Sequence, residues 1–214
     1  REKPANIALV LGDTRLTYAE TNGAANQVAS GLAAAGIGPG DRVMLHCPNL
    51  PYFPIVYFGI LKTGASVIPA NVLLKRDEIA YLLNDSGAKA YLCFEGTEEL
   101  PLGQEGWAAF DAAAKCEHFW MITADPRAPS PIEGTQTLGM LMGPQPPTFD
   151  TVQRASDDEA VALYTSGTTG RPKGAQLTHS NILRNAMVTA ELMRTEREQG
   201  MLVTVPLCHV FGQV

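Results

Sequence analysis

The chain has 214 residues, of which 45% are apolar and 18% are charged, and its net charge is -6. These values fit a globular protein with a substantial core. The acidic balance offers no basic surface for nucleic acid and argues against a polybasic membrane anchor, so an anionic substrate needs a local positive site. No apolar run reaches the roughly 20 residues of a transmembrane segment, although peripheral membrane contact stays open.

The cysteines give no sign of a metal site or of a secreted protein. The four of them form no C-x-x-C pair, and the first residues of the sequence show no charged n-region followed by an apolar h-region, so a secretory signal is not expected. Cys208 lies beside His209, but a single Cys-His dipeptide is poor evidence for zinc. We therefore expect free thiols in a reducing, cytoplasmic compartment.

Short apolar runs alternate with helix-like segments along the first part of the chain. The first helix is expected to begin at Thr17-Tyr18-Ala19-Glu20, a T-x-x-E capping box, and to end at Gly36. Further helices are predicted over 52–62, 77–84, 107–115 and 135–142, and strands over 7–10, 42–47, 66–70, 89–94 and 119–123. This alternation predicts an α/β fold with mainly parallel strands.

The second part of the chain begins with proline-rich stretches at 125–131 and 143–149, which predict a long connection or a subdomain boundary near 125–150. A strand is expected over 159–165, preceded by a solvated turn at 157–159, and another over 201–205. Between them, Thr178 or Ser180 should cap a long helix. We expect the apolar stripe of that helix to pack into the core; it comprises Ile182, Leu183, Ala186, Met187, Ala190 and Met193.

The stretch from Tyr164 to Gly174, YTSGTTGRPKG, combines glycines, hydroxyls and a lysine. Glycines let backbone N–H groups approach an anion, hydroxyls add hydrogen bonds, and Lys173 adds positive charge, so the stretch predicts a phosphate-binding loop. It is not a Walker A loop, because Pro172 replaces the second glycine and Gly174 replaces the magnesium-binding Ser or Thr. A Gly/Ser/Thr-rich linker is the plain alternative, but linkers rarely end in Pro-Lys-Gly between a strand and a helix.

Two segments together resemble a known family. The stretch 164–174 is similar to the phosphate-loop signature of the adenylate-forming superfamily, which includes acyl-CoA synthetases, peptide-synthetase adenylation domains and luciferases. The stretch 206–213, PLCHVFGQ, is similar to its second segment, P-L-x-H-x-F-G, although Cys208 stands where such ligases often have a bulky apolar residue. The stretches LTYAE, GPGDRV, PN and KTGA between residues 16 and 65 also agree.

The resemblance covers essentially the whole chain and is strongest to fatty-acid–CoA ligases. It implies that residues 1–214 are the N-terminal part, less than half, of a family member: the beginning of a large AMP-binding domain, without the C-terminal lid. In this family a carboxylate attacks the α-phosphate of Mg-ATP to give acyl-AMP and pyrophosphate, and the thiol of CoA then displaces AMP. Without the missing parts, we expect the chain alone to bind ATP weakly and to form no acyl-adenylate at a useful rate.

The resemblance also implies roles for individual residues. Lys173 would offset pyrophosphate charge, and His209 would lie near the substrate carboxylate with Phe211 in the acyl tunnel. Thr168, with Thr165 second, would help to hold Mg²⁺ beside a downstream glutamate. His179 is expected to be structural. The residues implied in binding the phosphates of ATP are Thr165, Ser166, Gly167, Thr168, Thr169, Gly170 and Lys173.

Two other functions remain open from the residues alone. One is a P-loop NTPase or kinase, which the positions of Pro172 and Gly174 argue against. The other is a non-catalytic module that binds a nucleotide or an acyl group. The sequence does not identify the acid, the acceptor thiol (CoA or a carrier protein) or the oligomeric state.

Overall fold

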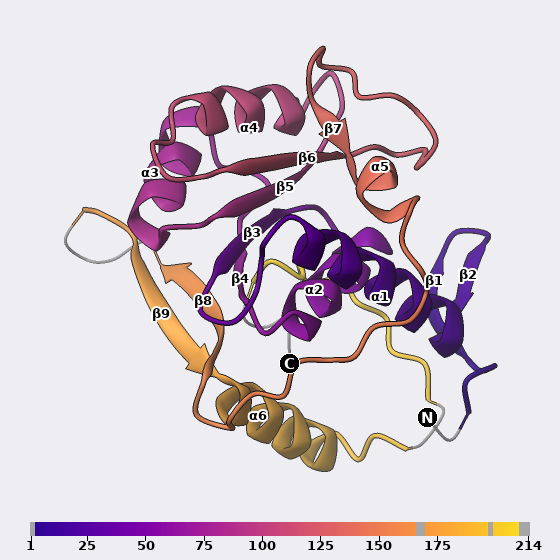
Figure 1. Ribbon diagram of the computed structural model, residues 1–214. Coiled ribbons are helices and arrows are strands. Elements are labelled where there is room, and N and C mark those ends of the chain that lie inside the picture. Colours follow the sequence, from indigo (N-terminus) through magenta and orange to yellow (C-terminus); the bar gives the residue numbers. More distant parts are fainter. Residues whose placement is uncertain (1–2, 166–169, 197–198, 210–214) are drawn as a thin grey trace.

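The computed structural model describes residues 3–165, 170–196 and 199–209. Its centre is a seven-stranded sheet with the strand order β7-β6-β5-β3-β4-β8-β9, beside a separate two-stranded hairpin of β1 and β2 (Figure 1). The strands are β1 (Ile7–Leu11), β2 (Thr14–Thr17), β3 (Arg42–His46), β4 (Ser66–Pro69), β5 (Ala90–Phe94), β6 (His118–Ile122), β7 (Gln136–Thr137), β8 (Glu159–Thr165) and β9 (Lys173–Thr178). Every pairing in the large sheet is parallel except that of β8 with β9, which confirms the predicted α/β class.

Helices cover both faces of this sheet. They are α1 (Tyr18–Ala34), α2 (Tyr52–Lys62), α3 (Arg76–Ser86), α4 (Leu102–Asp111), α5 (Leu138–Met142) and α6 (His179–Leu192). Helices α1, α2 and α5 pack together, while α3 and α4 pack together across the sheet (Figure 1). Right-handed crossovers require this, because the chain moves in one direction from β3 to β4 and in the other from β4 to β5 and β6. None of the helices among the described residues is long and apolar enough to span a membrane.

Local signals placed most elements correctly. Helix α2 and strand β8 have the predicted bounds, and Thr17 and Glu20 form the predicted capping box at α1. Thr178 caps α6, and Gly36 takes the left-handed conformation after α1. Helix α4, however, begins and ends several residues before the predicted 107–115, and the predicted helix over 135–142 divides into the short strand β7 and helix α5. Strands β2 and β9 were not predicted.

Two predictions for the last part of the described chain were wrong. Residues 201–205 form no strand: among the described residues the segment has no ladder partner, and the side chains of Leu202 and Val203 are exposed. An apolar run becomes a strand only when another strand satisfies its backbone groups. Most of the apolar stripe of α6 does not enter the core either: Leu183 is 62% and Met187 64% exposed, and only Ile182 of the predicted stripe packs against the core. The helix follows the edge strand β9, and none of its residues is fully buried.

The connection from α5 to β8 lies along α1 and α2. The side-chain amide of Asn26 donates to the carbonyl of Pro147 at 2.8 Å, and the N–H of Val152 donates to the carbonyl of Lys62 at 2.9 Å. The subdomain boundary expected near 125–150 stays a prediction. Beyond this connection, β8 enters the sheet beside β4 and carries the chain to the phosphate-loop candidate.

Candidate functional site

The phosphate-loop candidate joins β8 to β9, which pair in antiparallel fashion. Their register places Thr165 opposite Lys173 and Tyr164 opposite Gly174. Residues directly opposite each other project on the same face, so the Thr165 hydroxyl and the Lys173 ammonium group share one face at the base of the loop, and both residues are exposed. Gly170 has a φ of 98°, which glycine adopts without strain. Four predicted phosphate ligands lie outside the described residues: Ser166, Gly167, Thr168 and Thr169.

Gly174 has a packing role that the sequence did not reveal. A Cβ atom there would lie 3.2 Å from Cζ and 3.3 Å from Cε2 of Tyr164, so the tyrosine ring rests against the glycine backbone. The Ser or Thr of a Walker A loop would push this ring away. In addition, strand β9 follows the loop, whereas a Walker A loop opens directly into a helix. Both observations argue against a P-loop NTPase.

Helix α3 anchors both arms of the loop. Tyr164 Oη donates to Asp85 Oδ2 at 2.7 Å, and Tyr81 Oη donates to the carbonyl of Pro172 at 3.0 Å. The Arg171 guanidinium carbon lies 6.0 Å from the centroid of the Tyr81 ring, at the limit of a cation–π contact. Burial, together with the Asp85 carboxylate, raises the pKa of Tyr164 well above its usual range, so its hydroxyl keeps its proton at neutral pH. Tyr81 and Asp85 stand four positions apart on α3, but no sequence signal identified their partners.

An ion pair holds the other end of β8. Arg42 Nε donates to Glu159 Oε1 at 2.7 Å, its Nη2 to Oε2 at 2.5 Å, and its Nη1 to the carbonyl of Ser86 at 3.0 Å. This bidentate pair ties β3 to β8 across the intervening strand β4, and the hydrogen bonds to Glu159 raise the pKa of Arg42. Glu159 therefore does not belong to a solvated turn, as its sequence position had suggested.

The second candidate segment, 206–209, lies at the carboxyl edge of the sheet. Asn49, just beyond β3, donates from Nδ2 to the carbonyl of Val205 at 2.9 Å, and its Oδ1 accepts from the N–H of Leu207 at 2.7 Å. Because β8 runs parallel to β4 and β3, Thr165 leaves the sheet at this same edge. The edge also includes the switch point between β3 and β5, where open α/β sheets bind ligands. His209 is exposed there, and Phe211 lies outside the described residues.

A buried polar cluster lies within the sheet near this edge. His46 is fully buried, and its Nδ1 lies 2.8 Å from Tyr91 Oη and 3.8 Å from Cys93 Sγ. Burial lowers the pKa of His46 to about 4, so the ring is neutral at pH 7. All four cysteines are free, as predicted, and three of them are buried.

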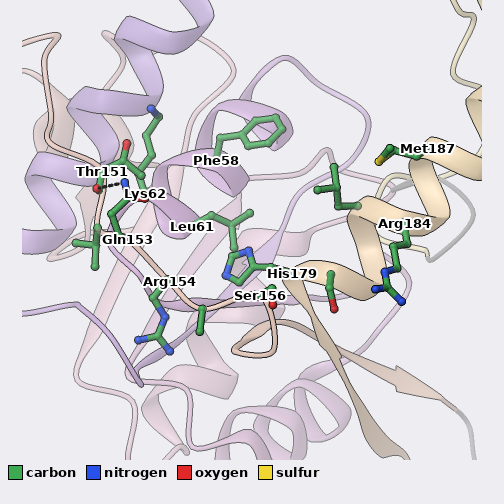
Figure 2. A pocket seen from close by; sticks show the side chains of 14 residues that line it. Phe58, Leu61, Lys62, Thr151, Gln153, Arg154, Ser156, His179, Arg184 and Met187 are labelled. Carbon is green, nitrogen blue, oxygen red and sulfur yellow. Dashed lines mark hydrogen bonds between the residues drawn. The ribbon is translucent and has the colours of Figure 1, made fainter.

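A groove of about 700 Å³ separates α2 from α6. In Figure 2, Phe58 and Leu61 lie on the α2 side and Arg184 and Met187 on the α6 side. The segment 151–156 runs from the left, where Thr151 and Gln153 lie beside Lys62, to Ser156 below His179. Its lining mixes apolar side chains with polar and charged ones, and it includes none of the predicted phosphate ligands that the structure describes. His179 begins α6, and its N–H donates to the carbonyl of Asp158 at 3.2 Å.

The described residues do not form a metal site. They contain no group of three or more His, Cys, Asp or Glu side chains that could hold a metal ion. At the base of the loop, the Thr165 hydroxyl has no carboxylate beside it in the β8–β9 register, and a hydroxyl alone is a weak magnesium ligand. The Mg²⁺ prediction for Thr168 falls outside the described residues.

Comparisons with known proteins agree with this architecture. The chain is 33% identical over 198 residues to the long-chain-fatty-acid–CoA ligase FadD13 of Mycobacterium tuberculosis, covering 92% of this chain and 36% of the relative. ATP-bound MatB from Rhodopseudomonas palustris superposes with a TM-score of 0.83 at 28% identity, over 99% of this chain and 39% of that one. The anthranilate CoA ligase AuaEII in complex with anthranoyl-AMP superposes with a TM-score of 0.75 at 30% identity, over 86% of this chain and 34% of that one.

The chain thus spans little more than a third of the length of these relatives. The sequence profile described as AMP-binding enzyme matches it from residue 1 to residue 214. The predicted family and the parallel α/β architecture are both confirmed. The chain belongs to the AMP-binding enzyme family.

Proposed function

We propose that the full-length gene product containing this chain uses ATP to convert a carboxylic acid to an acyl-adenylate and then to a CoA thioester. The observation that carries the proposal is the β8–β9 hairpin, which sets Lys173 opposite Thr165 at the base of a glycine- and hydroxyl-rich loop. FadD13 and AuaEII, both named as CoA ligases and the second solved with an acyl-adenylate, support it, as does the similar structure of ATP-bound MatB.

In the first step the substrate carboxylate attacks the α-phosphorus of ATP, and pyrophosphate leaves. ATP enters as its magnesium complex. We assign the binding of the β- and γ-phosphates to the loop residues Thr165, Ser166, Gly167, Thr168, Thr169 and Gly170. Lys173 offsets the charge that develops on the leaving pyrophosphate. We assign to Thr168, with Thr165 second, a part in holding the Mg²⁺ of the ATP complex; a hydroxyl is a weak magnesium ligand, so a carboxylate would have to join it.

In the second step the thiol of CoA attacks the acyl carbon, and AMP leaves with its phosphate. We place the acid near His209, because the segment 206–209 lies at the same edge of the sheet as the end of β8. The name of FadD13 favours a fatty acid, whereas that of AuaEII shows that an aromatic acid is used elsewhere among similar structures. Four free thiols support a reducing, cytoplasmic location.

The test is acid-dependent release of pyrophosphate by the full-length gene product, with butyrate, octanoate, palmitate and anthranilate as substrates. We expect one of these acids to raise release above the ATP-only rate. Lys173→Ala should lower kcat by about 10²-fold through lost stabilisation of the leaving group. Lys115→Ala, which removes an exposed lysine a few residues after α4, is the matched control and should behave as wild type.

Two outcomes would contradict the proposal. Release of phosphate from ATP at a rate that does not depend on any of the acids would favour an NTPase. ATP binding without turnover of any acid would favour a binding module. Unchanged kcat and KM for ATP in Lys173→Ala would remove the role assigned to Lys173 alone.

A further inference from the structure

The side chain of Asn49, just beyond β3, holds the backbone of the segment 205–207. Asn49 donates from Nδ2 to the carbonyl of Val205 at 2.9 Å and accepts at Oδ1 from the N–H of Leu207 at 2.7 Å. These two backbone groups belong to residues i and i+2, the pair that a neighbouring strand would engage. The amide of Asn49 therefore replaces one rung of a β-ladder for a segment that has no strand partner among the described residues.

Two further contacts extend the attachment toward His209. The side chain of Cys208 is only 9% exposed and packs into the hydrophobic core. The N–H of His209 donates to the carbonyl of Pro206 at 2.9 Å, which closes a turn. The hydrogen bonds of Asn49 to Val205 and Leu207, followed by the turn from Pro206, thus connect Asn49 to the backbone of His209.

The phosphate end of the site has different supports. Tyr81 and Asp85 hold the arms of the β8–β9 hairpin, and Asn49 takes part in neither contact. A change at Asn49 should therefore reach the segment that carries His209 and leave the arms of the phosphate loop in place.

We propose that Asn49 is a positioning residue for the acid-binding half of the site, acting through His209; this inference rests on the proposed function. Within the described part of the chain the Asn49 side chain bonds to Val205 and Leu207, and in this assignment it does not touch the substrate. Its amide fixes the backbone of Val205 and Leu207, and the turn from Pro206 transmits that constraint to His209.

Amide hydrogen exchange on the full-length gene product tests the attachment without reference to activity. Asn49→Ala should raise exchange at Leu207 by about tenfold or more, because two hydrogen bonds are lost. Asn84→Ala is the matched control: Asn84 also makes one donor and one acceptor bond, to Ala80 at 2.9 Å and Ala114 at 3.1 Å, on α3. It should leave Leu207 unchanged. Unchanged exchange in Asn49→Ala would overturn the attachment.

Kinetics with the most active acid of the panel separate positioning from general destabilisation. Asn49→Ala should lower kcat/KM for the acid by about 10-fold or more while KM for ATP stays within about twofold. When His209 is already alanine, adding Asn49→Ala should lower kcat/KM for the acid no further. Equal losses for acid and ATP, or additive losses in the double variant, would overturn the inference.

A second variant covers the case in which Asn49→Ala does not fold. Asn49→Asp keeps the acceptor for Leu207 but sets a carboxylate against the carbonyl of Val205. It should therefore also lower kcat/KM for the acid while KM for ATP stays nearly unchanged. Wild-type values for both parameters in Asn49→Asp would count against the inference. If wild-type protein itself releases no acid-dependent pyrophosphate, the proposed function fails, and the exchange experiment still decides whether Asn49 holds the segment.

Discussion

Replacing His46 with glutamine should change how the stability of this protein depends on pH. His46 is fully buried at the end of β3, where its Nδ1 shares a hydrogen bond of 2.8 Å with Tyr91 Oη. The nearby thiol of Cys93 is neutral, because burial raises its pKa to about 12. Protonating the imidazole would therefore create a buried cation with no anion beside it. Glutamine keeps a hydrogen-bonding side chain at this position but does not titrate.

The magnitude follows from the shift in the pKa of His46. Burial lowers this pKa from 6.5 to about 4, a difference of about 2.5 units, and each unit corresponds to 1.36 kcal/mol. Because the folded pKa is the lower one, the unfolded chain binds the proton more readily between these values. The stability is therefore fully present above pH 6.5 and is lost as pH falls toward 4, by about 3 kcal/mol.

The assay is urea-induced unfolding of the wild type and His46→Gln at a series of pH values from 7.5 to 4.5. Other groups titrate in this range in both proteins, so the informative quantity is the difference between their pH slopes. We expect the wild type to lose about 2 to 3 kcal/mol more than the variant. Parallel curves would refute the reasoning, as would an NMR titration in which the His46 ring takes up its proton near pH 6.5.

Two further predictions concern packing. Gly31→Ala should destabilise the protein by about 1 to 3 kcal/mol in urea unfolding, because its Cβ would lie 2.6 Å from the carbonyl oxygen of Leu141. Gly23→Ala is the control, since its Cβ would make an ordinary contact with Pro147 at 3.5 Å. Equal stability of the two variants would contradict the prediction, because it would show that α5 moves aside without cost. A thiol reagent at pH 8 should modify the native protein far more slowly than the urea-unfolded protein, because burial raises the pKa of all four thiols. Rapid modification of one thiol per molecule of native protein would contradict this burial. The thiols are those of Cys47, Cys93, Cys116 and Cys208.

The sequence by itself determined what depends on neighbours within a few residues. The capping box of Thr17 and Glu20, the apolar run of α2 and the strand that feeds the phosphate loop are local patterns, and they lie where predicted. The two motifs also identified the family, because a signature of short segments in order does not require knowledge of distant contacts.

Only the tertiary structure decided which distant groups meet. Strand β9 exists because β8 pairs with it, and residues 201–205 form no strand because no other segment that the structure describes pairs with them. The partners of Tyr164 and Asn49 lie 79 and 156 to 158 residues away, beyond the reach of any periodicity or capping rule. Chain topology therefore decided which residues support the candidate site. Buried backbone groups need hydrogen-bonding partners, and these partners can be far away in the sequence, so local sequence patterns do not predict them.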